Sequence, residues 1–160
     1  MNKFFFSLSL SLIISIGYCQ LPNINLKDLN GVTKNLSKFS NNGKPIIISF
    51  WATWCKPCKL ELNTIAENYD DWTKETGVKL IAVSIDDARS SSRVEPYINA
   101  QGWEYLILLD PNGDLKRAMN VNNVPHTFLV AGNGKIVWNH NNYSPGDEEE
   151  LYEELVKIAK

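Results

Sequence analysis

Runs of apolar residues alternate with amphipathic stretches along this chain, and the alternation predicts strands followed by helices. Residues 46–51 are β-branched and aromatic almost throughout, which is typical of a strand buried on both faces of a parallel sheet. Apolar positions three and four residues apart predict a helix over 56–73, which Gly77 ends. Two more buried strands are expected over 78–85 and 104–109.

The remaining elements complete an α/β pattern. A short strand and a turn at 24–31 come first, helices are expected over 88–101 and 114–119, and strands over 126–130 and 135–138. Pro96 is a fault in the first of those helices. Asp147 with Glu150 predicts a capping-box-like start for the last helix. Strands and helices in this order predict layers of helices on a central sheet.

The first nineteen residues have the pattern of an export signal. Asn2 and Lys3 give a short positive start, and residues 4–16 are apolar or serine but fewer than the ~20 of a membrane-spanning helix. Gly17 and Cys19 then place small residues before Gln20. We expect a signal peptide at 1–19 and one domain at 20–160.

Two other interpretations of this segment stay open. Cys19 could be a lipidated N-terminus, although the bulky Tyr18 before it argues against a lipidation signal, or the segment could be an uncleaved anchor. All three place the domain outside the cytoplasm, in the periplasm or cell envelope, either soluble after cleavage near Cys19 or held at the membrane.

Composition narrows the class of protein. The 160 residues fit one domain, and 44% apolar residues with five Trp supply a core. Sixteen basic against eighteen acidic residues leave a net charge of −2, which does not favour a nucleic-acid partner. Three cysteines are too few for a disulfide scaffold, and loss of residues 1–19 would leave only Cys55 and Cys58.

Those two cysteines lie where the strand over 46–51 gives way to the helix. Free backbone N–H groups and the helix dipole stabilise a thiolate at Cys55, and Lys56 adds a positive charge beside it. Pro57 is tolerated in the first helical turn and stiffens it. Two intervening residues bring the sulfurs within bridging distance, so Cys55 is expected to attack a disulfide and Cys58 to resolve the mixed disulfide.

A structural disulfide and a metal site are the alternatives for this pair. A bridge across two residues closes a very short loop and restrains little of the unfolded chain. Zinc needs about four ligands, and only His126 and His140 are obvious additions. A c-type haem would need His where Lys59 stands. Redox chemistry is therefore favoured, with no metal and no cofactor other than the disulfide itself.

The segment Phe50–Cys58 resembles the active site of thioredoxin-fold proteins, and more closely that of the exported TlpA/ResA-like disulfide reductases. Residues 109–113, 123–130 and 134–137 are similar to later parts of that family, so the resemblance covers about 22–160. It implies a thioredoxin-like fold, with a central mixed β-sheet flanked by helices. An extra strand and helix are expected between the CxxC helix and the cis-proline strand.

The resemblance also implies roles for individual residues. Val124-Pro125 would be a cis peptide beside the cysteines, and the Val124 backbone would pair with an extended substrate segment. Glu61, one turn after Cys58, would be a buried carboxyl that exchanges the Cys58 proton, the alternative being a solvated helix acid. Trp54 is expected to pack around the site, with Trp51, and to contact substrate.

Partners also follow from the resemblance. It implies reduction of protein disulfides, with apocytochrome c as one target, by electrons from a membrane thiol donor. The domain is expected to be a monomer.

The sequence departs from the family pattern at four places. Ser49 replaces the buried Asp of thioredoxins, so proton transfer by that route is expected to be absent. Asn63 replaces a helix proline, which predicts a straighter helix. His126 replaces the threonine after the cis-proline, and either makes the thiolate pH-dependent or lies on the solvent-facing rim; with Pro125 it is also expected to contact substrate. Asn141-Asn142 replaces a glycine in the loop beside the site.

Two other functions share parts of this pattern. A thiol peroxidase of peroxiredoxin type would place its threonine one residue farther from the cysteine than Thr53 is from Cys55. A copper carrier of Sco type would separate its two cysteines by three residues and add a distal His. Whether the pair reduces or oxidises its substrates depends on its reduction potential, which the sequence leaves open.

Overall fold

The structure is a computed structural model, and it describes residues 20–159. The expected signal peptide at 1–19, including the alternative anchor at Cys19, lies outside the described residues. Within residues 20–159, no helix combines the length and the apolar character needed to cross a bilayer.

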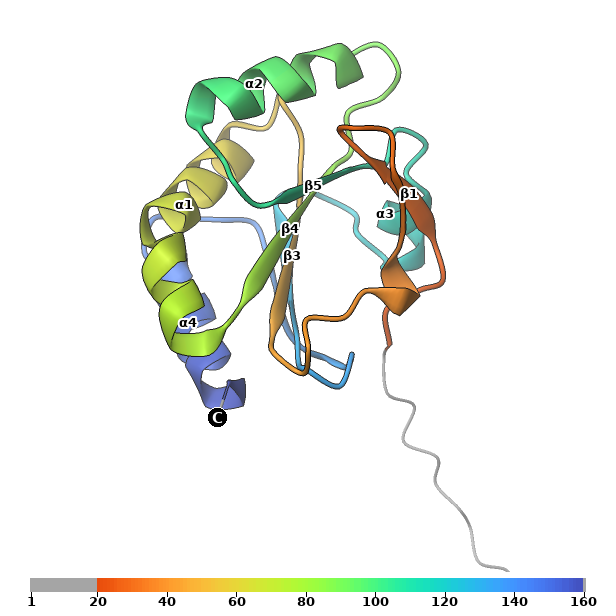
Figure 1. Cartoon of the computed structure of the whole chain (residues 1–160). Helices are drawn as coiled ribbons and strands as arrows, with labels where there is room; N and C mark the ends of the chain where they lie inside the picture. The colour runs from red at the N-terminus through yellow and green to blue at the C-terminus, as the bar shows by residue number, and fades with distance from the viewer. Residues whose placement is uncertain (1–19, 160) are drawn as a thin grey trace, which may run out of the picture.

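In the described part of the chain, seven strands form one mixed sheet, in the spatial order β2-β1-β5-β4-β3-β6-β7. The strands are β1 Asn25–Asp28, β2 Thr33–Asn35, β3 Ile46–Trp51, β4 Lys79–Ser84, β5 Leu106–Leu109, β6 His126–Val130 and β7 Ile136–Asn141. Strands β3, β4 and β5 are parallel, whereas β6 runs antiparallel to β3 and β7 antiparallel to β6 (Figure 1). The parallel centre explains why β3 is buried at every position.

Within residues 20–159, three α-helices and two short 3-10 turns lie between the strands, and a fourth α-helix follows the last strand. The helices are α1 Lys56–Thr76, α2 Val94–Gln101, α3 Asp114–Ala118 and α4 Asp147–Ile158, and the turns are η1 Leu36–Lys38 and η2 Ser91–Arg93. In Figure 1, α1 and α4 lie side by side, on the other side of the sheet from α3. Elements β4, α2, β5 and α3 lie between the CxxC helix and the strand after Pro125, as expected for this fold.

Side chains that alternate along the strands pack into two hydrophobic cores, one on each face of the sheet. Ile47 and Trp51 of β3 pack with α1, α2 and α4, together with both cysteines. Ile48 and Phe50 of the same strand pack on the other face, with Leu115 of α3. Because successive side chains of a strand point to opposite faces, this division fixes which face each residue of β3 and β6 serves.

Element bounds match the predictions best where a turn residue ends the element. Strand β3 occupies the predicted residues 46–51, and α1 ends at Gly77, whose φ of 71° is left-handed. The predicted helix over 88–101 begins only at Val94, after η2. Pro96 therefore lies in the first turn of α2, where its missing N–H leaves no helical hydrogen bond unmade, so it is not a fault.

The predicted capping box of α4 is wrong. Gly146 is the N-cap residue and makes no side-chain capping bond. Asp147 already lies within the helix, and its Oδ2 accepts from the Ser144 N–H at 2.7 Å. Glu150 accepts from the Trp138 indole instead. The acids of this first turn still suit the positive end of the helix dipole.

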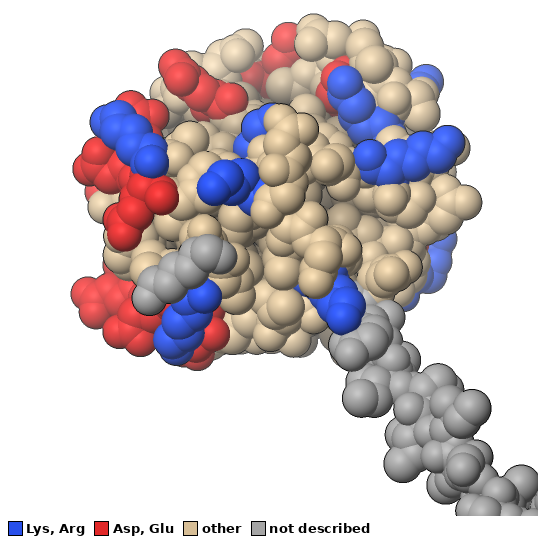
Figure 2. All heavy atoms as spheres, turned by 60° about the horizontal axis from the view of Figure 1, so that its bottom comes forward, with Lys and Arg blue, Asp and Glu red and all other residues tan. Residues whose placement is uncertain are grey.

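Surface charge is uneven on the side turned away from the cysteine end of α1. Figure 2 shows acidic side chains gathered mainly at one edge of this face, while Lys and Arg lie both beside them and over the remainder. Helices α1 and α4 are rich in acids on their outer faces, at Asp70, Asp71, Glu149 and Glu153 among others. These charges keep the exposed faces of both helices in water while their apolar faces meet the sheet.

Two leucines on α1 test this packing. Leu62 is fully buried in the core beneath the cysteines, whereas Leu60, two residues earlier, is 46% exposed. Leu62→Ala is expected to lower the free energy of unfolding by about 2–5 kcal/mol, because it leaves a cavity. Leu60→Ala should change it by less than about 0.5 kcal/mol. Urea denaturation of both variants measures the difference, and equal losses would contradict this assignment of the core face.

Candidate active site

Cys55 and Cys58 form a disulfide at the N-terminus of α1, with their Cα atoms 5.4 Å apart. Cys55 is the N-cap residue, and its sulfur accepts a hydrogen bond from the Cys58 N–H at 3.3 Å. Cys58 is fully buried, whereas Cys55 retains 5% exposure. A helix N-terminus favours negative charge, so this position stabilises a thiolate at Cys55. Pro57 lies in the first turn of the helix and Lys56 is exposed beside it.

Glu61 lies one turn farther along α1 and is buried behind the disulfide. Its Oε1 accepts from the Thr127 hydroxyl at 2.6 Å and its Oε2 from the Ser49 hydroxyl at 3.1 Å. Burial raises the pKa of Glu61 to about 7, although the two hydrogen bonds oppose the rise. The solvated-acid alternative is therefore wrong, and the carboxyl can hold or release a proton near neutral pH.

Ser49 and Thr127 form the floor under Glu61, and sequence reasoning missed Thr127. The two residues are paired across the antiparallel strands β3 and β6, so their side chains share one face of the sheet. Ser49 lacks the carboxyl group that thioredoxins have at this position, but its hydroxyl donates a hydrogen bond to the Glu61 carboxyl on α1. A hydroxyl in each of two buried and mainly apolar strands was the signal available in the sequence.

The Val124–Pro125 peptide is cis and precedes β6. Val124 packs against the cluster that contains both cysteines. The Pro125 carbonyl accepts from the Asn142 N–H at 2.8 Å, which ties the loop after β7 to this turn. Asn142 has a φ of 80°, the left-handed conformation that a glycine would adopt easily and asparagine tolerates. Asn142 can therefore adopt the backbone conformation that the glycine of related proteins would have at this loop position.

His126 contradicts one of its two sequence expectations, the exposed position. Its ring is buried, so it does not lie on a solvent-facing rim. It stacks on Phe128 with centroids 4.3 Å apart and bonds Asn139 Oδ1 through Nε2 at 3.2 Å. Its neighbour Thr127 points to Glu61, so the His126 ring lies on the opposite face of β6. Burial lowers its pKa, which keeps the ring neutral near pH 7.

The two tryptophans of the motif have different environments. Trp51 is fully buried and packs against Tyr97 and Trp103. Trp54 is 62% exposed, so the expectation that it packs around the site is wrong. An open hollow of about 430 Å³ adjoins Trp54. It is lined also by Ile85, Asp87, Arg89, Ser90 and Arg93.

A buried aspartate that the sequence analysis did not single out fixes the loop before the cysteines. Asp86 follows β4 and accepts from the Thr53 N–H at 2.8 Å and from the Thr53 hydroxyl at 2.6 Å. The Ser84 hydroxyl donates to the same carboxylate at 2.9 Å. These bonds hold residues 52–54 against the end of the sheet and thereby position Cys55. Across residues 20–159, no cluster of three or more His, Cys, Asp and Glu could hold a metal ion.

Comparison with known proteins gives this site a family context. The AhpC/TSA family matches residues 18–139. The thiol-disulfide oxidoreductase ResA of Bacillus subtilis is 34% identical over 116 residues, 72% of this chain and 62% of ResA. ResA of Bacillus thuringiensis subsp. konkukian is 30% identical over 140 residues, 88% of this chain and 77% of that protein. The match to the B. subtilis protein therefore spans less than two thirds of that relative.

Solved structures are similar over most of the chain. A thioredoxin-like protein from Porphyromonas gingivalis is 53% identical with a TM-score of 0.79, covering 89% of this chain and 93% of that one. StoA from Bacillus subtilis is 25% identical with a TM-score of 0.63, covering 82% and 99%. The fold is thioredoxin-like, as the resemblance of the sequence implied.

The raised pKa of Glu61 predicts how stability depends on pH in the disulfide form. The unfolded chain releases this proton near the ordinary value of 4.5, and the folded chain near 7. The folded state therefore binds the extra proton between these values, and its free energy of unfolding falls as pH rises through that window. The difference between these two pKa values corresponds to a change of roughly 3 kcal/mol in the free energy of unfolding.

Chemical denaturation across this window measures the effect. Glu61→Gln should abolish the fall in the free energy of unfolding that Glu61 causes. The difference in this free energy between wild type and variant, followed against pH, therefore isolates the contribution of Glu61. Glu67→Gln removes an exposed acid of the same helix and should retain the fall. An unchanged slope in Glu61→Gln would show that the carboxyl titrates at its ordinary pKa.

Proposed function

The chain belongs to the AhpC/TSA family, and on that premise we propose that it is a thiol–disulfide oxidoreductase that reduces protein disulfides. One observation carries the proposal. Cys55 and Cys58 are bonded to each other at the N-terminus of α1, and the Cys58 N–H donates to the Cys55 sulfur. The same N–H would stabilise a thiolate on Cys55 once the pair is reduced. The disulfide itself is the redox group, and we propose no further cofactor or metal.

The first step is attack by Cys55 of the reduced protein. Its thiolate attacks one sulfur of the substrate disulfide, and a new sulfur–sulfur bond forms as the substrate bond breaks. The other substrate sulfur leaves as a thiolate and takes a proton from solvent. Lys56 adds positive charge beside the attacking sulfur, and Pro57 fixes the turn that separates the two cysteines.

The second step releases the substrate. Glu61 accepts the proton of the Cys58 thiol, and the resulting thiolate attacks the Cys55 sulfur of the mixed disulfide. The intermolecular bond breaks, and the second substrate sulfur leaves as a thiolate that takes a proton from solvent. Two electrons have passed to the substrate, and the Cys55–Cys58 bond is restored. The burial of Cys58 suits this role, because only an intramolecular partner can reach it.

The substrate would approach between Trp54 and Val124. Trp54 exposes most of its ring at the cysteine end of α1, next to the open hollow. An extended substrate segment can pair with the Val124 backbone, in the manner of strand addition, and pack beside Pro125. The His126 ring lies on the opposite face of β6 from Thr127, so we propose that it supports the strand without touching the substrate.

We propose that this chemistry takes place outside the cytoplasm. The pattern of residues 1–19 supports export, and the similarity to ResA proteins is consistent with it. A membrane thiol donor would return two electrons to the disulfide after each cycle. Apocytochrome c is one protein whose disulfide could be the target. The domain would act as a monomer.

The geometry favours neither alternative function. A peroxidase would need the Thr53 hydroxyl beside its cysteine, but that hydroxyl donates to Asp86. A copper carrier would need His near both sulfurs, yet His140 pairs with Asp147 and the His126 ring packs on Phe128. Peroxide consumption and copper titration of the reduced protein are the matching assays.

Single-cysteine variants test the assigned order of attack. Reduced Cys58→Ser should accumulate a mixed disulfide with insulin, because Cys55 can attack but nothing resolves the product. Cys55→Ser should trap little, since its remaining thiol is buried. Non-reducing electrophoresis and mass spectrometry identify the trapped cysteine. A larger yield from Cys55→Ser would reverse the roles of the two sulfurs.

A further inference from the structure

We propose that a small cavity between α1, β7 and α4 is the route by which Glu61 exchanges its proton with solvent, with the His140–Asp147 ion pair at its mouth. The inference rests on the proposed function, because it concerns the proton released by Cys58 during the second step. It assigns positioning and proton-relay roles to residues that the reaction described above does not use.

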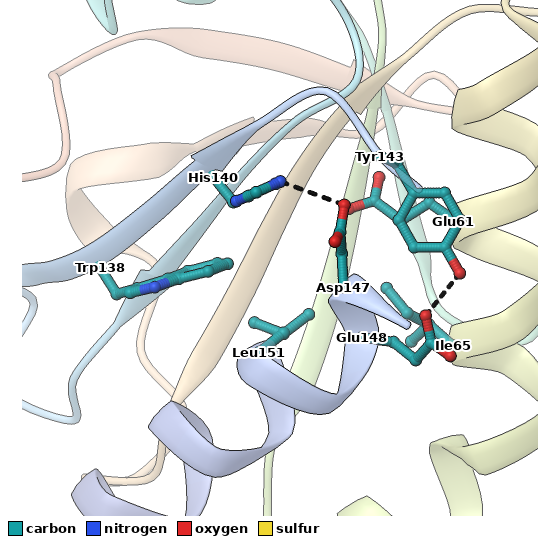
Figure 3. A pocket seen from close by; sticks show the side chains of 8 residues that line it. All are labelled: Glu61, Ile65, Trp138, His140, Tyr143, Asp147, Glu148 and Leu151. Atoms are coloured by element: carbon teal, nitrogen blue, oxygen red, sulfur yellow. Dashed lines mark hydrogen bonds and ion pairs between the residues drawn. The ribbon is translucent and has the colours of Figure 1, made fainter. Parts of the chain in front are cut away.

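The cavity begins at Glu61 and extends toward His140 and Asp147. Its walls come from α1, from β7, from the loop after β7 and from α4, as Figure 3 shows. The lining residues are Glu61, Ile65, Trp138, His140, Tyr143, Asp147, Glu148 and Leu151. Neither cysteine, Trp54 nor Val124 is among them. A substrate seated on those residues would therefore leave the cavity open.

The size and polarity of the cavity suit a single water molecule. The space open to water centres is about 10 Å³, close to the minimum for one molecule. Each carboxylate oxygen of Glu61 accepts one hydroxyl and keeps capacity for another donor. The carboxylate of Asp147 and the ring of His140 supply further polar partners on the other side. A water here can join the buried carboxyl to the surface.

The mouth of the cavity is formed by a pair that can carry a proton. His140 Nε2 lies 3.3 Å from Asp147 Oδ2, and about one third of each side chain is exposed. The ring is held parallel to Trp138, with centroids 5.8 Å apart. An imidazole has two ring nitrogens that can each accept or donate a proton, so the ring can take a proton from the cavity water at one nitrogen and release one to solvent at the other.

The other titratable groups facing Glu61 do not offer this route. Tyr143 donates its hydroxyl to Glu148 at 2.6 Å, and burial raises its pKa to about 12. Tyr105 donates to the Leu62 carbonyl, and burial raises its pKa as well. Both phenols therefore stay protonated. Asp147 acts on Glu61 through its negative charge, which favours the protonated carboxyl.

The route accounts for the proton released in the second step and involves no electron transfer. The Cys58 thiol gives its proton to Glu61, Glu61 gives it to the cavity water, and His140 passes it to bulk solvent. Glu61 is then a carboxylate again and ready for the next cycle. The front of the site would be closed by the substrate throughout, and the cavity supplies the exit that this closure requires.

His140→Ala tests the route with a built-in diagnostic. The full-length reduced protein is mixed with insulin, and decay of the mixed disulfide is followed by rapid acid quench at pH 7. We expect the mixed disulfide to decay roughly tenfold more slowly. This loss is smaller than the ~10²–10⁴-fold rate effect typical of a group that transfers the proton directly. Added imidazole should restore the rate by replacing the missing ring. Formation of the mixed disulfide should not change.

Two controls separate a relay from a structural effect. Val137→Ala shortens an exposed side chain on the other face of β7, outside the cavity, and should leave the decay unchanged. A small disulfide such as oxidised glutathione leaves the front of the site open, so His140→Ala should scarcely slow its reduction. Equal slowing with both substrates, or no rescue by imidazole, would overturn the proposal.

Asp147→Asn is the second variant if His140→Ala folds poorly. Loss of its negative charge should lower the pKa of Glu61, read from the carboxyl ¹³C shift, and slow the same decay. Glu149→Gln changes the same charge at an exposed position outside the cavity and should do neither. If the wild type fails to reduce insulin, the proposed function fails. If it reduces insulin and both variants match it, only the relay fails.

Discussion

The burial of one carboxyl group, Glu61, is the constraint on which this site depends. A charged carboxylate in the interior is costly, so the fold either pairs it or lets it keep its proton near neutral pH. The hydroxyls of Ser49 and Thr127 donate hydrogen bonds to the carboxylate, but these bonds only partly offset the cost of burial. The pKa of Glu61 therefore stays raised to about 7. The result is a proton-exchanging group held one helical turn behind Cys58.

In the reaction that we propose, sulfur exchange and proton transfer take place in separate parts of the fold. The sulfur chemistry lies at the N-terminus of α1, where the helix dipole favours a thiolate and Trp54 is open to a partner. The proton transfer that we propose lies inside, between α1 and the sheet, and uses the cavity between β7 and α4. Asp86 joins these regions to the scaffold, because it fixes the loop that leads from β3 to Cys55.

Local patterns in the sequence predicted the elements and the reactive pair, but not the contacts between distant strands. Residues 46–51, Gly77 and the two cysteines each have a local signal, and the structure agrees with all of them. Thr127 was missed because its role depends on pairing with Ser49 and on a helix 66 residues earlier in the chain. The His126 ring was misplaced for a related reason: only register shows which face of β6 it serves.

The reduction potential of the Cys55–Cys58 pair as a function of pH, in the wild type and Glu61→Gln, tests the central claim most directly. The account predicts a wild-type potential near the thioredoxin value of about −270 mV, with a change of slope near pH 7 that Glu61→Gln lacks. The slope changes because the carboxyl and the cysteines share protons. Profiles that superimpose across neutral pH would contradict the coupling, and a potential near −120 mV would make the protein an oxidant of thiols.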